Sequence, residues 1–236
     1  MAEGFGSFES VQRPHTKEDA GYKTIFERVQ EEAGGEAKPY NWYRNTVRRF
    51  ALSRIGGDPA KLIRDEIQDR MGNDEEEDAN QLRRWAVQGH LFLYEYNPKL
   101  KLKLPYYDTF PLVYCVKANA KEFWGANLHY LSPKKRVWVI NRLMQGRIDI
   151  PRFCFHKYLI EHVDGFLLDL ASEEWATAIL LPIEQFVKNN NKSKLGQISY
   201  KKEMVWEEAK DKFYDKIKSR VVVRNYNTLE SKEMVN

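Results

Sequence analysis

The chain has 236 residues and a formal net charge of +4, with 42% hydrophobic and 31% charged residues. This is a globular composition with a polar lean, and the mean hydropathy of −0.66 indicates long exposed segments. Two cysteines exclude a disulfide framework and no apolar run approaches the ~20 residues of a membrane span, so we expect a soluble protein without a membrane partner, assembled in a reducing cytosol.

The N-terminal third is predicted to be an arm followed by helices. Residues 1–38 have few periodic hydrophobic residues and no signal-peptide pattern, which predicts a flexible or partner-ordered arm with room for a short helix over 22–32. Residues 39–88 form a helical segment in which Asn41 caps a helix over 42–55. A second helix over 59–71, an acidic connector over 74–78 and a short helix over 80–87 follow.

Residues 89–187 are predicted to form the β-rich core. Apolar and aromatic residues over 91–96 predict a strand that is covered on both faces, and alternating Leu and Lys over 99–104 predict a strand with one cationic face. Two further strands over 112–117 and 123–131 complete a small antiparallel meander or an SH3-like barrel. Ser132-Pro133 starts a helix over 133–146, and we expect another helix over 152–163.

The C-terminal part is predicted to be a short helix and then a charged segment. Ser172 caps the short helix, which Pro182 ends. Residues 188–236 contain a basic loop, an amphipathic helix over 201–220 and a tail. The expected fold class is therefore α+β, with helices around the sheet and extended N- and C-terminal arms.

Two basic stretches near aromatic residues are candidates for DNA contact, because cations bind the phosphate backbone and rings stack on bases. The candidate residues are Arg44, Arg48, Arg49 and Arg54 in the first helix, and Lys134, Lys135, Arg136 and Arg142 in the helix after the strands. The alternative is a solvated helix face, or a patch that meets an acidic protein partner. No base-reading motif is present.

Metal binding and catalysis are not expected. Cys115, His129, Cys154, His156 and His162 fall in the folded region, but no metal-ligand spacing joins them, so buried thiols and core histidines are the simpler interpretation. The sequence has no nucleophile elbow, P-loop or dinucleotide-binding pattern. We expect a protein that is not an enzyme and has no cofactor.

The segment Leu104–Leu112 (LPYYDTFPL) is the most distinctive in the chain. Its two prolines predict a rigid corner, and Asp108 is placed to accept backbone N–H groups in the turn. An additional function is possible for its rings, since Tyr106, Tyr107 and Phe110 would anchor a protein partner if they were exposed.

Three segments carry a resemblance to a known family: LPYYDTFPL, FWGANLHYLSP (123–133) with Arg136 after it, and EEWATAILLPIEQF (173–186). Together they resemble a virion protein family of T-even-type myoviruses, the phage DNA end protector family. The resemblance covers about 90–186 and implies a tailed-phage structural protein of the virion that binds and protects the ends of packaged DNA near the portal or neck. Its partners would be double-stranded DNA ends and portal, neck or tail subunits, and assembly would occur in the host cytoplasm. The alternative is a neck, tail or baseplate component that acts only through protein–protein contacts.

Overall fold

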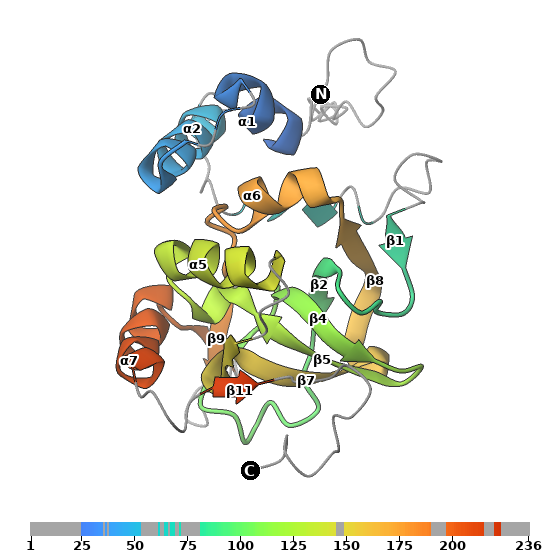
Figure 1. The fold of residues 1–236 in the computed structure, drawn as a ribbon. Helices are drawn as coiled ribbons and strands as arrows, with labels where there is room; N and C mark the ends of the chain where they lie inside the picture. The colour runs from blue at the N-terminus through green and yellow to red at the C-terminus, as the bar shows by residue number, and fades with distance from the viewer. Residues whose placement is uncertain are drawn as a thin grey trace, which may run out of the picture.

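The computed structural model describes residues 25–34, 36, 38–52, 81–144, 149–189, 197–214 and 220–222, with single positions between 61 and 71. Helices surround antiparallel sheets, which confirms the predicted α+β class (Figure 1). Residues 1–24 of the arm predicted over 1–38, and the tail over 223–236, lie outside the described residues. No described helix is long and apolar enough to cross a membrane.

A six-stranded antiparallel sheet forms the centre of the molecule. Its strands, in spatial order, are β1 (Leu82–Arg83), β8 (Val163–Leu170), β2 (Leu91–Tyr96), β4 (Leu112–Ala118), β5 (Glu122–Asn127) and β7 (Phe155–Leu159). β2, β4 and β5 correspond to the predicted strands over 91–96, 112–117 and 123–131, and β7 adds a fourth strand to this meander where a helix was predicted. β8 then returns to pair with β2. The sheet therefore combines neighbouring strands with the long-range pairings of β8 to β1 and to β2.

Both faces of β2 are buried, as its alternation of aliphatic and aromatic residues predicts. Leu91 and Leu93 belong to the larger core, which the helices complete. Phe92, Tyr94 and Tyr96 belong to a second core on the opposite face. Strand residues alternate between faces, so a continuous apolar run fits only a strand with cores on both sides.

The sheet curls around the second core without closing into a barrel. Two strands separate β2 from β7, so a flat sheet would place them about 14 Å apart. The ring of Tyr158 in β7 nevertheless lies 5.7 Å from Tyr94 and 5.0 Å from Tyr96, centroid to centroid. Among the described strands no ladder joins β7 to β1 or β8. The sheet is thus an open, curled meander, and the closed SH3-like barrel is not formed.

The helices cover the outer face of this sheet. α1 (Ile25–Ala33), α2 (Tyr40–Leu52) and α6 (Trp175–Ala178) lie on one side in Figure 1, with α5 (Pro133–Met144) beside the sheet and α7 (Lys202–Tyr214) at the periphery. A three-stranded sheet joins β3 (Tyr107–Asp108), β9 (Phe186–Asn189) and β10 (Gln197–Ser199). A two-stranded sheet joins β6 (Asp149–Pro151) and β11 (Arg220–Val222). The predicted helices over 42–55, 133–146 and 201–220 correspond to α2, α5 and α7.

Several predicted elements are wrong. Residues 80–87 contain β1 and turns, and 152–163 contain two 3-10 turns around β7, because pairing with distant strands outweighs a local pattern that fits either period. Residues 99–104 form exposed turns instead of a strand. α2 begins at Tyr40, directly after Pro39, so Asn41 is not its cap. The short helix after Ala171 is a 3-10 turn, Ser172–Glu174, that continues into α6.

Candidate functional site

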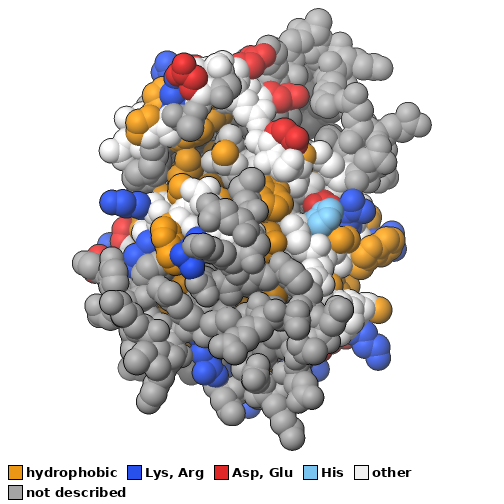
Figure 2. Space-filling model, viewed as in Figure 1, with side chains coloured by type: hydrophobic (Ala, Val, Ile, Leu, Met, Phe, Trp, Pro, Cys, Tyr) orange, Lys and Arg blue, Asp and Glu red, His pale blue; other side chains and the backbone are white. Residues whose placement is uncertain are grey.

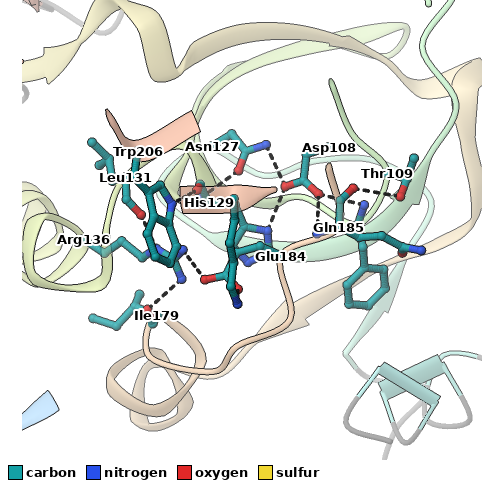
Figure 3. A network of polar contacts seen from close by, with 12 residues as sticks. Asp108, Thr109, Asn127, His129, Leu131, Arg136, Ile179, Glu184, Gln185 and Trp206 are labelled. Atoms are coloured by element: carbon teal, nitrogen blue, oxygen red, sulfur yellow. Dashed lines mark hydrogen bonds and ion pairs between the residues drawn. The ribbon is translucent and has the colours of Figure 1, made fainter. Parts of the chain in front are cut away.

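The three sequence segments that carry the resemblance meet in one buried polar network (Figure 3). Asp108, in the rigid corner, is the shared acceptor and its side chain is 1% exposed. Its Oδ1 accepts the backbone N–H groups of Phe110 (3.1 Å) and Gln185 (3.3 Å). Its Oδ2 accepts Asn127 Nδ2 (3.2 Å) and lies 2.8 Å from His129 Nδ1. One carboxylate therefore ties together residues that are up to 77 positions apart.

Asn127 and His129 fix the end of β5 against this carboxylate. The side-chain oxygen of Asn127 accepts the backbone N–H of His129 at 3.0 Å and so caps the 3-10 turn Leu128–Tyr130. The His129 side chain is fully buried, and its Nε2 has no partner among the described residues. His129 is therefore a core histidine held by hydrogen bonds, as the sequence suggested.

Arg136 is the cationic centre of the network. This side chain of α5 is fully buried, and it donates from Nε to the carbonyl of Leu131 (2.8 Å) and from Nη1 to that of Ile179 (3.1 Å). Its Nη2 forms an ion pair with Glu184, whose other oxygen accepts Lys202 Nζ of α7 at 2.7 Å. The network thus anchors α5, the loop before β9 and α7 to one point.

The charge state of Glu184 follows from these neighbours. Burial alone raises the pKa of a carboxyl group, because it disfavours the charged form. Here the cations of Arg136 and Lys202 outweigh burial and lower the pKa of Glu184 to about 2. Glu184 is therefore ionised at neutral pH, and the pair is a fixed structural contact instead of a proton carrier.

Trp206 closes the network from α7. Its indole N–H donates to the carbonyl of His129 at 3.0 Å, and its ring lies near the cations of Arg136 and Lys202. The polar side chains that the three segments contribute to the network, Asp108, Asn127, His129 and Glu184, are thus enclosed. Their arrangement can hold the fold together, but they do not form a surface for a ligand.

The exposed cations of α5 present a different surface. Lys134 is exposed, Lys135 is half-buried, and the guanidinium of Arg142 lies 4.7 Å from the ring centre of Trp138, which is itself 36% exposed. Figure 2 shows Lys and Arg side chains beside hydrophobic ones over this part of the molecule. Arg136 points away from this surface, so the expectation that it contacts DNA needs correction: its burial leaves it out of reach of a phosphate.

Fewer of the candidate DNA-binding side chains of α2 than of α5 are described by the structure. Arg49 is exposed, forms an ion pair with Glu32 of α1 and lies beside the ring of Phe50. The side chains of Arg44 and Arg48, and all of Arg54, lie outside the described residues. Because three of these four candidate side chains lie outside the described residues, α5 offers the better described cationic surface.

The candidate partner anchors in the rigid corner are mostly enclosed. Tyr107 is 4% exposed and Phe110 is fully buried, so neither ring is available to a partner. Tyr106 is half-buried, stacks on Tyr200 at 4.8 Å and donates its hydroxyl to Glu208 of α7 at 2.9 Å. Burial raises the pKa of Tyr106, and the hydrogen bond with Glu208 raises it further. The expectation of a partner site on these rings is corrected: Tyr106 joins the corner to α7, and the rings of Tyr107 and Phe110 are buried in the fold.

An open cleft of about 400 Å³ lies where β1 and β8 pair at one edge of the sheet, lined by Gln81, Arg83, Gly89, His90, Asp169, Leu170, Ala171, Ser172 and Trp175. The buried carboxylate of Asp169 forms an ion pair with Arg83 and lies 2.9 Å from His90 Nδ1. Arg83 and His90 both contact Asp169, the one acidic residue among those that line this cleft. Its contacts explain how β1 is held beside β8.

The cysteines and histidines do not form a metal site within the described part of the chain. Cys115 and Cys154 are buried free thiols, and Cys154 donates to the carbonyl of Pro151 at 3.0 Å. His156 packs against the ring of Tyr130 at 4.6 Å, and burial lowers its pKa to about 4. His162 Nδ1 lies 2.9 Å from the carbonyl oxygen of Asn97. Each group is explained by packing.

Comparison with known proteins identifies one family. Residues 79–154 match the family model described as phage T4 terminal DNA protecting protein. No curated protein and no solved structure matches the chain. The matched range contains the first two of the three segments, the strands from β1 to β5 and the whole of α5.

Proposed function

On the premise that residues 79–154 have the sequence pattern of the phage T4 terminal DNA protecting protein family, we propose that this chain binds and protects the ends of phage DNA. It would be a structural protein of a tailed-phage virion, assembled in the host cytoplasm. It would sit near the portal or neck, in contact with portal, neck or tail subunits. The family match is the observation that carries the proposal.

The exposed face of α5 is the proposed DNA-binding surface. Lys134, Trp138 and Arg142 follow one another at intervals of four residues, so they lie along one side of the helix. Cations bind the phosphate backbone without regard to base sequence, and an exposed ring beside them can pack on sugars or unstacked bases. Lys135 adds a further charge next to this row. This arrangement supports binding to any DNA, as protection of ends requires.

To protect a DNA end, this protein would only need to occupy it, without catalysing a reaction. The distinctive polar residues are used inside the fold, where Asp108 and Glu184 hold their neighbours. A bound protein shields an end because an exonuclease needs access to the same terminal nucleotides. Tight, salt-dependent binding is therefore sufficient for the proposed function.

Binding of the purified protein to linear and circular duplex DNA, measured across a salt series, tests the proposal. We expect a steep decrease of affinity with salt and a preference for linear DNA. The double variant Lys134→Gln/Lys135→Gln removes two phosphate contacts, so the slope of log affinity against log salt should become smaller by about 2. Both side chains lie on α5 outside the buried network, so the thermal midpoint should not change.

Lys121→Gln is the matched control. This exposed lysine lies in the β4–β5 hairpin, on the far side of the molecule from α5 in Figure 1. Its replacement should leave the salt slope within error of the wild-type value. If the wild-type protein binds DNA with no dependence on salt, or does not bind at low salt, the alternative gains support: a neck, tail or baseplate component held by protein contacts alone.

A further inference from the structure

The loop between β2 and β3 exposes three leucines. Leu100 is 56% exposed, Leu102 is 75% exposed and Leu104 is 37% exposed. Lys99 before them and Lys103 between Leu102 and Leu104 are also exposed, and no acidic residue occurs over 97–106. The loop lies at the end of the molecule opposite α1 and α2 (Figure 1). Contiguous exposed apolar side chains on a folded protein mark a contact surface.

Hydrogen bonds hold this loop in one conformation. Asn97 N–H donates to the carbonyl of His162 at 3.0 Å, and Lys101 N–H donates to that of Pro98 at 3.1 Å. Lys103 N–H donates to the carbonyl of Leu100 at 2.8 Å, and the Asn189 side chain binds the carbonyl of Lys101. The Lys101 ammonium donates to Asn97 Oδ1 at 3.0 Å. The leucines are therefore presented by a braced loop, which reduces the entropic cost of binding.

The exposed leucines of the β2–β3 loop and the lysines beside them indicate what kind of surface the loop would bind. Lys99 and Lys103 are exposed in the same loop as the three exposed leucines, so cationic and apolar side chains are both accessible to a ligand. The complementary surface is flat and apolar at its centre and anionic around its edge. The end of a DNA duplex has this form, because the outer face of the last base pair is unstacked and the terminal phosphates surround it.

We propose that Leu100, Leu102 and Leu104 pack on the exposed face of the terminal base pair while Lys99 and Lys103 bind the adjacent phosphates. This inference rests on the proposed function and adds to it the feature that distinguishes an end from the rest of the duplex. Phosphate contacts are the same along the whole duplex and cannot recognise an end. Apolar side chains do pack on base-pair faces where these are unstacked, and only an end offers such a face without the cost of unstacking.

Two DNA probes of the same sequence test the proposal: a short duplex with open ends, and the same duplex with both ends closed by hairpin loops. We expect the wild-type protein to prefer the open duplex by about tenfold or more, since tenfold needs only the burial of a few methylene groups. The variant Leu100→Ser/Leu102→Ser/Leu104→Ser should lose this preference and keep its affinity for the closed duplex. Its thermal midpoint should match that of the wild type because the three side chains are exposed.

A second readout locates the contact. With 2-aminopurine in the terminal pair of the open duplex, binding of the wild-type protein should change the fluorescence, whereas 2-aminopurine in the middle of the duplex should not respond. The triple variant should produce no terminal signal. Ile198→Ser, which replaces another exposed aliphatic residue (42% exposed) in β10, is the control and should behave as the wild type.

The outcomes separate the two proposals. If the wild-type protein binds open and closed duplexes equally, the proposed function fails and this inference fails with it. If the wild type prefers the open duplex and the triple variant keeps that preference, only the inference is overturned. That result, with loss of self-association in the triple variant by sedimentation, would assign the leucines to contact with a second copy of the chain.

Discussion

Arg136 and Glu184 depend on each other in the interior of the protein. Both side chains are at most 1% exposed, and an unpaired charge in such a position costs several kcal/mol. The two carbonyl groups and Lys202 complete the set of partners, so the two charges are paired and each nitrogen of the guanidinium donates a hydrogen bond. The pair links α5 to the segment before β9, so it fixes the position of α5 in addition to stabilising the fold.

Replacement of Arg136 should therefore destabilise the fold. Arg136→Met leaves Glu184 with one cationic partner, and we expect the free energy of unfolding to decrease by about 3–5 kcal/mol in urea denaturation. Lys134→Ala, on the exposed side of the same helix, is the control and should change it by less than about 0.5 kcal/mol. Equal stability of the two variants would contradict the central role of Arg136. The double variant Arg136→Met/Glu184→Leu should recover part of the loss.

His156 should make stability depend on pH. Its pKa is lowered from 6.5 to about 4 because burial disfavours the charged ring. The unfolded chain then takes up a proton at a higher pH than the native protein, so stability is complete above pH 6.5 and decreases as the pH falls towards 4. The loss is at most about 3 kcal/mol, because parts of the residue remain exposed.

The variant His156→Phe isolates this effect. It keeps a ring against Tyr130 and has no proton to gain, so its unfolding free energy should decrease less than that of the wild type between pH 6.5 and 4.5. Below pH 4.5 both proteins should lose further stability as Glu184, whose pKa is lowered to about 2, becomes protonated. Parallel pH profiles for the two proteins between pH 6.5 and 4.5 would refute the assignment.

The curl of the central sheet depends on close approach between β4 and β5. Gly125 lies opposite Cys115 in the ladder, and a Cβ atom added there would come within 2.4 Å of Val113 Cγ1 and 2.5 Å of the Tyr114 carbonyl oxygen. The register shifts between Cys115 and Lys117, a bulge that increases the local twist. Gly125 therefore permits the backbones to pack as the curled sheet requires.

A single methyl group at this point should strain the sheet. Gly125→Ala should lower the free energy of unfolding by about 3 kcal/mol, because the backbone carbonyl of Tyr114 cannot move aside without breaking the ladder. Gly165→Ala is the comparison: its Cβ has open space, but φ is +77°, so only a conformational cost of about 1 kcal/mol is expected. A smaller effect at Gly125 than at Gly165, measured by urea denaturation, would contradict this explanation.

The predictability of each element follows from the range of its contacts. β2 and α5 carry local signals that the fold preserves: an apolar run buried on both faces, and a proline at the first turn of a helix. β7 pairs with β5, about 30 positions earlier in the chain, and nothing in its own residues announces that partner. The Leu–Lys alternation over 99–104 has a strand period but no partner strand among the described residues, and so forms turns.

The candidate site shows the same division at the level of side chains. Asp108 was predictable as a turn acceptor because the prolines around it define the turn locally. The burial of Arg136 was not, since Glu184 lies 48 positions away and adjacent lysines look alike in the sequence. Sequence alone therefore located the basic helix but could not say which of its cations face solvent.

At the scale of the whole molecule, the structure separates the buried polar network from the exposed side chains that could contact a partner. The distinctive polar residues join three segments inside the fold, and the exposed cations of α5 and the leucines of the β2–β3 loop remain on the outside. An end-binding protein needs general affinity for phosphates together with a feature that recognises the terminus. In our proposal α5 provides the first and the β2–β3 loop the second, and both segments lie within the matched range of 79–154.

Digestion of a linear duplex by a double-strand exonuclease in the presence of the purified protein tests the central claim most directly. We expect stoichiometric protein per end to protect the full-length duplex at low salt, and this protection to be lost as salt rises. The Lys134→Gln/Lys135→Gln variant should lose it at lower salt. An exonuclease that removes nucleotides from both ends at the same rate with and without the protein, under conditions where the protein is folded, would contradict it.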